Sequence, residues 1–214
     1  GYNHAMQEQE EQILAYQNEI SKVEQELRTE QSNYHREVSR LESLKNMTER
    51  YDGYGNSIKR VMNNRDHEPG LLGVVADIVK VDKEYEIAVE TALGGRIQNI
   101  VTDNEETAKR MIQFLKKNKF GRATFLPLTS MHGGNGIRNE EALREPGVIG
   151  LANTLVHVEK KYQVLADQLL GKTIVVDHID HGIAIARKYR QSLRLVTLEG
   201  DLINPGGSMT GGAF

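Results

Sequence analysis

The segment DHIDH is the densest cluster of potential metal ligands in the sequence. Its histidines, His178 and His181, are three residues apart, a spacing that places both on one face of a helix, and Asp177 and Asp180 stand beside them. The segment follows an apolar run and opens a helical pattern. Acidic residues at that position also cap a helix and favour its dipole. We therefore expect helix capping here and no metal ion.

Two glycine clusters suggest phosphate loops, but neither matches a known phosphate-binding motif. A Walker-type loop needs a lysine after its last glycine, and neither cluster contains one. The sequence also lacks a dinucleotide fingerprint, an HExxH motif and a nucleophile with a recognisable base. It therefore predicts no catalytic site and no cofactor. The clusters are Gly133, Gly134 and Gly136 in GGNG, and Gly206, Gly207, Gly211 and Gly212 in GGSMTGG.

Basic residues form four clusters, each of which is by itself typical of a solvated surface or a last helical turn. Two clusters on one surface would attract a phosphate backbone without reading base sequence. The whole chain has 27 basic and 30 acidic residues, so we expect only weak, non-specific DNA binding. Our candidate DNA contacts are Lys59, Arg60, Arg65, Lys116, Lys117, Lys119 and Arg122, and the other clusters are Lys160 with Lys161, and Arg187, Lys188, Arg190 and Arg194.

Composition narrows the class of protein further. The chain has no cysteine, which excludes disulfides, cysteine zinc sites and thiol catalysis and fits a reducing compartment. No apolar run approaches the ~18 residues that span a bilayer, and no signal peptide is evident. We expect a soluble, cytoplasmic protein. Residues 1–6 (GYNHAM) have the character of an expression remnant.

Residues 7–50 are free of helix breakers and rich in Glu, Gln, Leu, Lys and Arg, which favour a helix. Alternating steps of three and four residues mark a coiled-coil seam, interrupted by charge at Glu30 and Glu37. A solvated helix lying on its own domain is the alternative, but so narrow a stripe favours pairing with one partner helix. That partner is expected beyond Phe214, so the chain has the character of a fragment. The seam comprises Ile13, Tyr16, Ile20, Val23, Leu27, Glu30, Tyr34, Glu37, Leu41, Leu44, Thr48 and Tyr51.

From residue 51 onward, glycines separate short apolar runs from helical stretches, which is typical of a mixed α/β domain. The loop 130–136 divides it into halves, 51–136 and 137–214. The order helix, strand, helix, strand occurs in both halves, which predicts a two-lobed pseudo-repeat. We expect helices at 57–63, 83–93, 104–117 with a cap among residues 102–104, 160–170 and 180–191, and strands at 72–78, 97–101, 123–128, 173–176 and 194–197.

The C-terminal run RLVTLEGDLINPGGSMTGG fits the Gly-x6-Gly-x3-Gly-Gly pattern of SMC (structural maintenance of chromosomes) hinge domains, through Gly200, Gly207, Gly211 and Gly212. Three further segments resemble the same family in the same order. They are YEIAVETALGGRIQNIVTD (85–103), GRATFLPL (121–128) and TIVVDHIDHGIAIAR (173–187). The resemblance covers essentially all of residues 51–214 and is closer to prokaryotic than to eukaryotic members.

This resemblance implies a two-lobed hinge that forms a two-fold, ring-like homodimer. It implies that the arm pairs with a returning helix of its own chain and leads to a distant ATPase head, which is absent here. The chain is then no enzyme but a dimerisation module for DNA entrapment, chromosome condensation and segregation. It would be associated with the nucleoid, and accessory subunits would bind elsewhere on the full-length protein.

Glycines let a second backbone approach a sheet edge closely, so the glycine-bordered edge is our expected dimer interface. Ordinary core packing is the alternative for each apolar residue proposed. Two other functions stay open: an α/β ligand-binding or enzymatic domain on a coiled-coil stalk, and a dedicated nucleic-acid-binding module. The expected interface comprises Gly200, Gly206, Gly207, Gly211, Gly212, Ala123, Phe125, Leu126, Ile203 and Met209.

Overall fold

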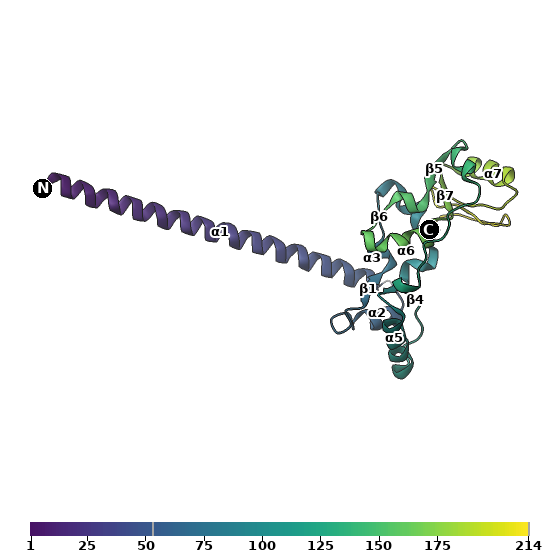
Figure 1. Cartoon of the computed structure of the whole chain (residues 1–214), viewed down its shortest axis with the longest axis horizontal. Helices are drawn as coiled ribbons and strands as arrows, with labels where there is room; N and C mark the ends of the chain where they lie inside the picture. The colour runs from purple at the N-terminus through teal and green to yellow at the C-terminus, as the bar shows by residue number, and fades with distance from the viewer. Residues whose placement is uncertain (53, 214) are drawn as a thin grey trace. The chain divides into compact units, whose positions relative to one another are not determined.

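The computed structural model describes residues 1–52 and 54–213, without the side chains of residues 43, 44 and 46–52. It separates at Gly53 into two compact units. The first unit is one uninterrupted helix, α1 (Tyr2–Asp52), drawn in purple and blue in Figure 1. This confirms the helix predicted for residues 7–50. The observed helix also includes residues 2–6 of the expected expression remnant.

Eight large apolar side chains between Ile13 and Leu41 of α1 are more than half exposed, as an unpaired coiled-coil helix requires. They include most apolar positions of the predicted seam. The seam positions Leu44, Thr48 and Tyr51 lie outside the described side chains. The exposed residues are Ile13, Leu14, Tyr16, Ile20, Val23, Leu27, Tyr34 and Leu41.

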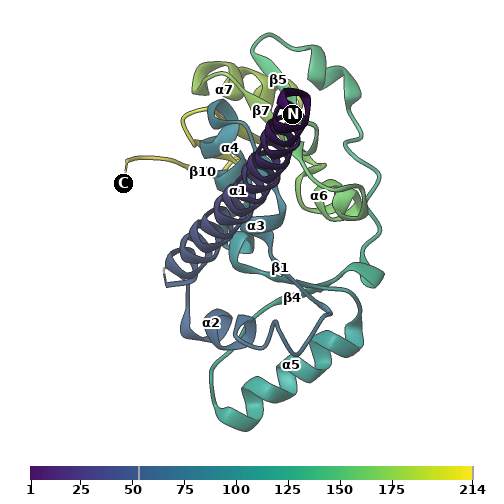
Figure 2. The same ribbon diagram turned by 90° about the vertical axis from the view of Figure 1, so that its left-hand side faces the viewer.

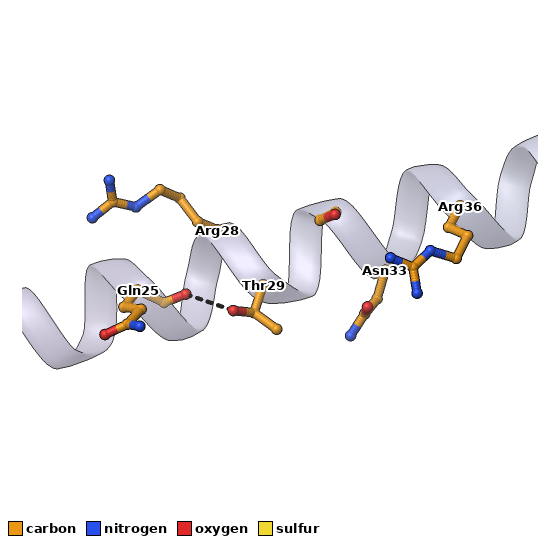
Figure 3. Close-up of a pocket in the computed structure, with 6 residues that line it drawn as sticks. Gln25, Arg28, Thr29, Asn33 and Arg36 are labelled. Atoms are coloured by element: carbon orange, nitrogen blue, oxygen red, sulfur yellow. Dashed lines mark hydrogen bonds between the residues drawn. The ribbon is translucent and has the colours of Figure 1, made fainter.

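A shallow hollow on α1 is lined by polar side chains alone (Figure 3). The Thr29 hydroxyl donates a hydrogen bond to the Gln25 carbonyl oxygen at 3.0 Å. This bond to the preceding turn is an ordinary local feature of helices, so the hollow does not indicate a ligand. Its lining residues are Gln25, Arg28, Thr29, Ser32, Asn33 and Arg36.

The second unit contains two related lobes, each built around one sheet. In the first lobe, strands β1 (Leu71–Val74), β3 (Ile100–Thr102) and β4 (Phe125–Pro127) lie in the order β1-β3-β4. Strand β1 is antiparallel to β3, and β4 is parallel to β3. Between β3 and β4 runs helix α5 (Glu105–Asn118), so β3, α5 and β4 form a β-α-β unit.

The second lobe repeats this connectivity and extends it. Strand β5 is antiparallel to β7, β8 is parallel to β7, and a bulge interrupts the first pairing just as one interrupts β1 and β3. The predicted pseudo-repeat is therefore confirmed. Two more strands prolong this sheet to the order β10-β9-β8-β7-β5. The strands are β5 (Val148–Leu151), β7 (Thr173–Val176), β8 (Arg194–Thr197), β9 (Leu202–Ile203) and β10 (Met209–Thr210).

A short antiparallel ladder joins the two lobes. Strand β2 (Lys80–Val81) pairs with β6 (Val156–His157), one strand from each lobe. Short helices complete the described elements: α2 (Asn56–Met62), α3 (Val75–Ile78), and the 3₁₀ helices η1 (Lys83–Tyr85), η2 (Gly94–Gln98), η3 (Leu128–Ser130), η4 (Glu140–Arg144), η5 (Ala152–Leu155) and η6 (Lys160–Tyr162).

One hydrophobic core is shared by both lobes. Helices α4 (Glu86–Leu93) and α6 (Gln163–Leu170) contact each other and contribute half of its buried residues, together with strands of both sheets. Helix α5 packs on β3 and β4 away from α4, and α7 (Ile179–Lys188) covers β7 and β8 with a separate cluster. Among the described helices, none is long and apolar enough to cross a membrane. The shared core includes Val75, Val89, Leu93, Val101, Leu165, Leu170, Val175 and Val196.

Several predicted boundaries need correction. The expected strand 72–78 ends at Val74, and the apolar residues after it form α3. A short apolar run is compatible with a strand or a buried helix, so its sequence could not separate the two. The strand expected at 97–101 begins only at Ile100, after η2. Helix α7 ends at Lys188 rather than 191, because Arg190 and Gln191 adopt left-handed backbone conformations.

Candidate functional site

Strand β4 ends the three-stranded sheet and presents a partly exposed edge. All three of its residues are half-buried, whereas Leu71 and Val74 on β1, at the other end of the sheet, are almost completely buried. Pro127 lacks an N–H group and is tolerated at a sheet edge for that reason. The β4 edge is therefore the accessible edge of this sheet.

The β9–β10 hairpin ends the other sheet. The Asn204 amide donates to the Ser208 carbonyl at 2.9 Å, and the Gly207 amide donates to the Asn204 carbonyl at 2.9 Å. Both residues of β10 are exposed, and the Met209 side chain is 54% exposed. Strand β10 therefore offers a second edge, with an apolar side chain open to solvent.

The predicted glycines serve this hairpin and its approach. Gly206 and Gly207 adopt φ of 94° and 96°, which the turn requires and which other residues rarely accept. At Gly211 a Cβ would lie 2.5 Å from Asp201 Oδ1, so glycine there allows the chain to pass close to the turn that precedes β9. At Gly200 a Cβ would lie 3.0 Å from Ile87 Cγ2 on α4. These glycines thus first satisfy contacts within their own chain.

One predicted lining residue needs correction. Ile203 is 2% exposed and packs in the core beneath α7, so its side chain is unavailable to a second chain. The alternation along β9 explains this, since neighbouring strand residues face opposite sides. Ala123, Phe125 and Leu126 are half-buried in and before β4, and Leu126 also packs on the shared core. The remaining candidates therefore form two groups, one at β4 and one on the hairpin.

Two of the basic clusters come together. Helix α2 lies next to the C-terminal end of α5 (Figure 1, Figure 2). The Arg60 guanidinium sits over the Phe120 ring at 4.5 Å from its centroid, a cation–π contact between the two clusters. Exposed basic residues Lys116, Lys117, Lys119 and Arg122 follow on from it, while Lys59 is half-buried and Arg65 is exposed. Lys160 and Lys161 lie in η6, in the other lobe.

The histidine cluster lies at the start of α7. Asp177 Oδ1 accepts hydrogen bonds from the His178 amide and from His181 Nδ1, both at 2.7 Å, and the two imidazole rings stack with centroids 4.4 Å apart. The capping prediction is wrong in detail, because His178 itself is the N-cap and its side chain caps nothing. One ligand atom each of Asp177, His178 and His181 lie within 4.8 Å of one another. Asp180 lies outside this group.

Asp177 gives a pH-dependent prediction. The hydrogen bond from His181 holds the pKa of its carboxyl below the usual range. A carboxyl whose pKa is lower in the folded state stabilises the fold at pH values above its unfolded-state pKa of about 3.9. This stabilisation is lost as the pH falls through the folded-state pKa. We expect Asp177→Asn to lower the melting temperature by about 1–3 °C at pH 7 and to lower it less near pH 3. Circular dichroism melts at both pH values measure this. Asp66→Asn, at an exposed turn position, is the control, and an Asp177→Asn shift that is unchanged by pH contradicts the prediction.

Comparison with known proteins identifies the family. Residues 68–186 match the family model described as the SMC proteins Flexible Hinge Domain. The chain is 38% identical over 208 residues to the chromosome partition protein Smc of Desulfitobacterium hafniense, and 35% identical over 219 residues to that of Bacillus subtilis. These alignments cover 95% and 97% of this chain but only 17% and 18% of the two relatives.

Solved structures agree. A crystal structure of an asymmetric dimer of the Geobacillus stearothermophilus SMC hinge domain matches with a TM-score of 0.74 and 38% identity, over 83% of this chain and 73% of that one. The Pyrococcus furiosus Smc hinge domain with an extended coiled coil matches with a TM-score of 0.62 and 30% identity, over 96% and 69%. The family model, the relatives and the fold agree, and the chain therefore belongs to the SMC hinge domain family.

Proposed function

We propose that this chain is the dimerisation hinge of a chromosome-partition SMC protein, joining two copies of itself. The observation that carries the proposal is the pair of accessible sheet edges, β4 in one lobe and β10 in the other. The similarity to an asymmetric hinge dimer supports it. Through this contact the full-length protein would entrap, condense and segregate DNA in the nucleoid.

Strands β4 and β10 are proposed as the pairing edges because the opposite edge strands, β1 and β5, are covered within their own lobes. The core-facing residues of β1 are buried, and β5 contacts the 3₁₀ helix η4, so both carry neighbours from their own lobe. Unpaired backbone N–H and C=O groups on an accessible edge favour pairing with another strand. Strand β4 of one copy then pairs with β10 of the other, and Phe125 and Met209 are the apolar side chains beside the new ladder.

Two-fold symmetry allows such short strands to form a stable dimer. A contact between unlike edges occurs twice in a closed dimer, so its buried area doubles. The proposed interface also includes Ala123, Leu126, Gly206, Gly207, Gly211 and Gly212. Gly200 contributes indirectly, because it lets the chain before β9 pack closely against α4.

The arm fits the same function. Its exposed apolar stripe matches a coiled coil with a returning helix from the same full-length protein, at whose far end an ATPase head would lie. This chain itself acts by binding and not by catalysis, and no cofactor enters the proposal. An α/β enzyme on a stalk is the alternative that the family membership disfavours.

Light scattering of the whole chain tests the proposal, with an expected mass of two chains. The arm could associate by itself, so a variant with Ile20→Glu and Leu27→Glu serves as control, since charges on the seam prevent coiled-coil pairing. This variant is expected to stay dimeric. A monomeric control variant overturns the proposal, because the dimer would then belong to the arm.

Weak DNA binding through the α2–α5 surface is a second proposal. It rests on the joined basic clusters, whose exposed lysines can contact phosphates. Each phosphate contact contributes about 0.9 to the slope of log affinity against log salt concentration. We expect Lys116→Gln with Lys117→Gln to reduce that slope by about 1–2 in fluorescence anisotropy with duplex DNA. The matched pair Lys160→Gln with Lys161→Gln leaves it unchanged, and equal slopes for both pairs contradict the assignment.

A further inference from the structure

A basic hollow is lined by residues of both lobes and reaches Thr124, just before β4. It measures about 720 Å³, within the range of small-molecule pockets, and it is formed at the C-terminal ends of α4 and α6 and the starts of β7 and β8. Its lining combines three cations, polar groups and an apolar floor. The residues are Leu93, Gly95, Arg96, Asn99, Thr124, Gln168, Leu169, Lys172, Thr173 and Arg194.

Two guanidinium groups converge in this hollow from different lobes. Arg96 Nη2 donates to the Ala92 carbonyl at 2.8 Å, and Arg194 Nη1 donates to the same oxygen at 3.0 Å. Arg194 Nη1 also donates to Thr173 Oγ1 at 2.8 Å, and Arg96 Nε donates to the Leu93 carbonyl at 3.1 Å. The fold therefore fixes both side chains in place before any ligand arrives.

The carbonyl groups at the C-terminal end of α4 offset part of the positive charge gathered here, but no carboxylate of the described chain pairs with it. Within the described part of the chain, Arg96, Lys172 and Arg194 form no ion pair with a carboxylate. Burial lowers the pKa of both arginines, and the positive charge of Arg96 lowers that of Arg194 further. Both stay charged at neutral pH, so half-buried like charges are held together without a counterion. Such an arrangement is relieved by a bound anion.

The chemistry of the donors indicates the anion. Guanidinium groups present forked N–H donors that match phosphate oxygens, and Arg96 Nη1 and the Nε and Nη2 of Arg194 donate no hydrogen bond within the described chain. Lys172 adds an exposed point charge, and Asn99, Thr124 and Gln168 add polar groups. We infer that this hollow binds a small phosphate-bearing molecule, with Arg96 and Arg194 gripping its phosphate and Lys172 closing over it.

A small ligand is favoured over a DNA backbone by the burial of the site. The two arginines are half-buried in a hollow, whereas the α2–α5 surface carries the exposed cations suited to a polyanion. The inference therefore does not rest on the proposed DNA surface or on the β10 edge, and only Thr124, between the proposed interface residues Ala123 and Phe125, lies beside the β4 edge.

Isothermal titration calorimetry of the whole chain with sodium pyrophosphate, at ionic strength held constant with sodium chloride, tests the inference. We expect a dissociation constant below about 1 mM, since a preformed charged site gives charge-assisted hydrogen bonds. Lys172→Gln and Arg96→Lys should each weaken binding at least about tenfold, the second because lysine keeps the charge but loses the fork. Lys109→Gln, an exposed lysine on α5, should leave it unchanged.

The Lys172→Gln variant makes the test decisive even if Arg96→Lys fails to fold. The Lys172 side chain is exposed, so its replacement leaves the fold and the arginine hydrogen bonds intact. Equal weakening by Lys109→Gln, or no binding below 1 mM, overturns the inference. Binding of a single-stranded oligonucleotide through Arg96 and Lys172 without any binding of pyrophosphate also overturns it, in favour of a DNA groove.

Discussion

Replacing Met209 by glutamate is expected to convert the dimer into a folded monomer at low micromolar concentration. The Met209 side chain is 54% exposed on the edge strand β10, so the change leaves the single chain intact. Burial of a methionine is worth about 1.5–3 kcal/mol, and a carboxylate in its place adds a desolvation cost. Because the contact occurs twice, the dissociation constant should rise at least about 100-fold.

Ile112→Glu is the matched control for this result. Ile112 is also an exposed apolar residue, 40% exposed on α5, and it belongs to neither edge strand. Sedimentation equilibrium should find this variant dimeric and Met209→Glu monomeric, with identical circular dichroism spectra. A dimeric Met209→Glu variant contradicts the assignment of the β10 edge.

Leu165→Ala is expected to destabilise both lobes together. Leu165 on α6 is completely buried in the core that α4 and α6 share. Removing a buried leucine side chain costs about 2–5 kcal/mol through lost burial and the cavity left behind. For a domain of this size, that lowers the melting temperature by about 4–20 °C.

The shape of this transition is as informative as its midpoint. A shared core predicts one cooperative transition for the variant and for the parent chain, measured by circular dichroism at one fixed protein concentration. Ile112→Ala is the control and should change stability by less than about 0.5 kcal/mol. Two separate transitions in the variant contradict a common core.

Much of the second unit could be predicted from the sequence. The successful predictions concern segments whose structure is determined by burial of their apolar residues. Strands 173–176 and 194–197 were predicted to the residue, because both are short apolar runs beside strong helical patterns. The Asn104 cap of α5 was among the predicted caps, and its side chain accepts from the Thr107 amide at 3.0 Å. Strands β2, β6, β9 and β10 were missed, since two-residue strands exist only through their partners, and the four-residue strand β5 (Val148–Leu151) was missed as well.

The candidate sites were predictable to a lesser degree. The glycines that shape the β9–β10 hairpin carry a clear signal, but the sequence did not show that Ile203 faces the core. The basic hollow was missed because Arg96 belongs to no cluster in the sequence and Arg194 was grouped with α7 residues. Only the packing of α4 against the second sheet brings the two together.

The shared core has a consequence for the size of the assembly. When two unlike edges join head to tail, the angle between them decides whether two copies close into a ring or a chain of copies keeps growing. Here that angle is set by α4 and α6, deep inside the domain. The number of subunits thus depends on interior residues that no partner contacts. Core substitutions that loosen the packing of α4 against α6 would then produce open polymers, even with the edge strands unchanged.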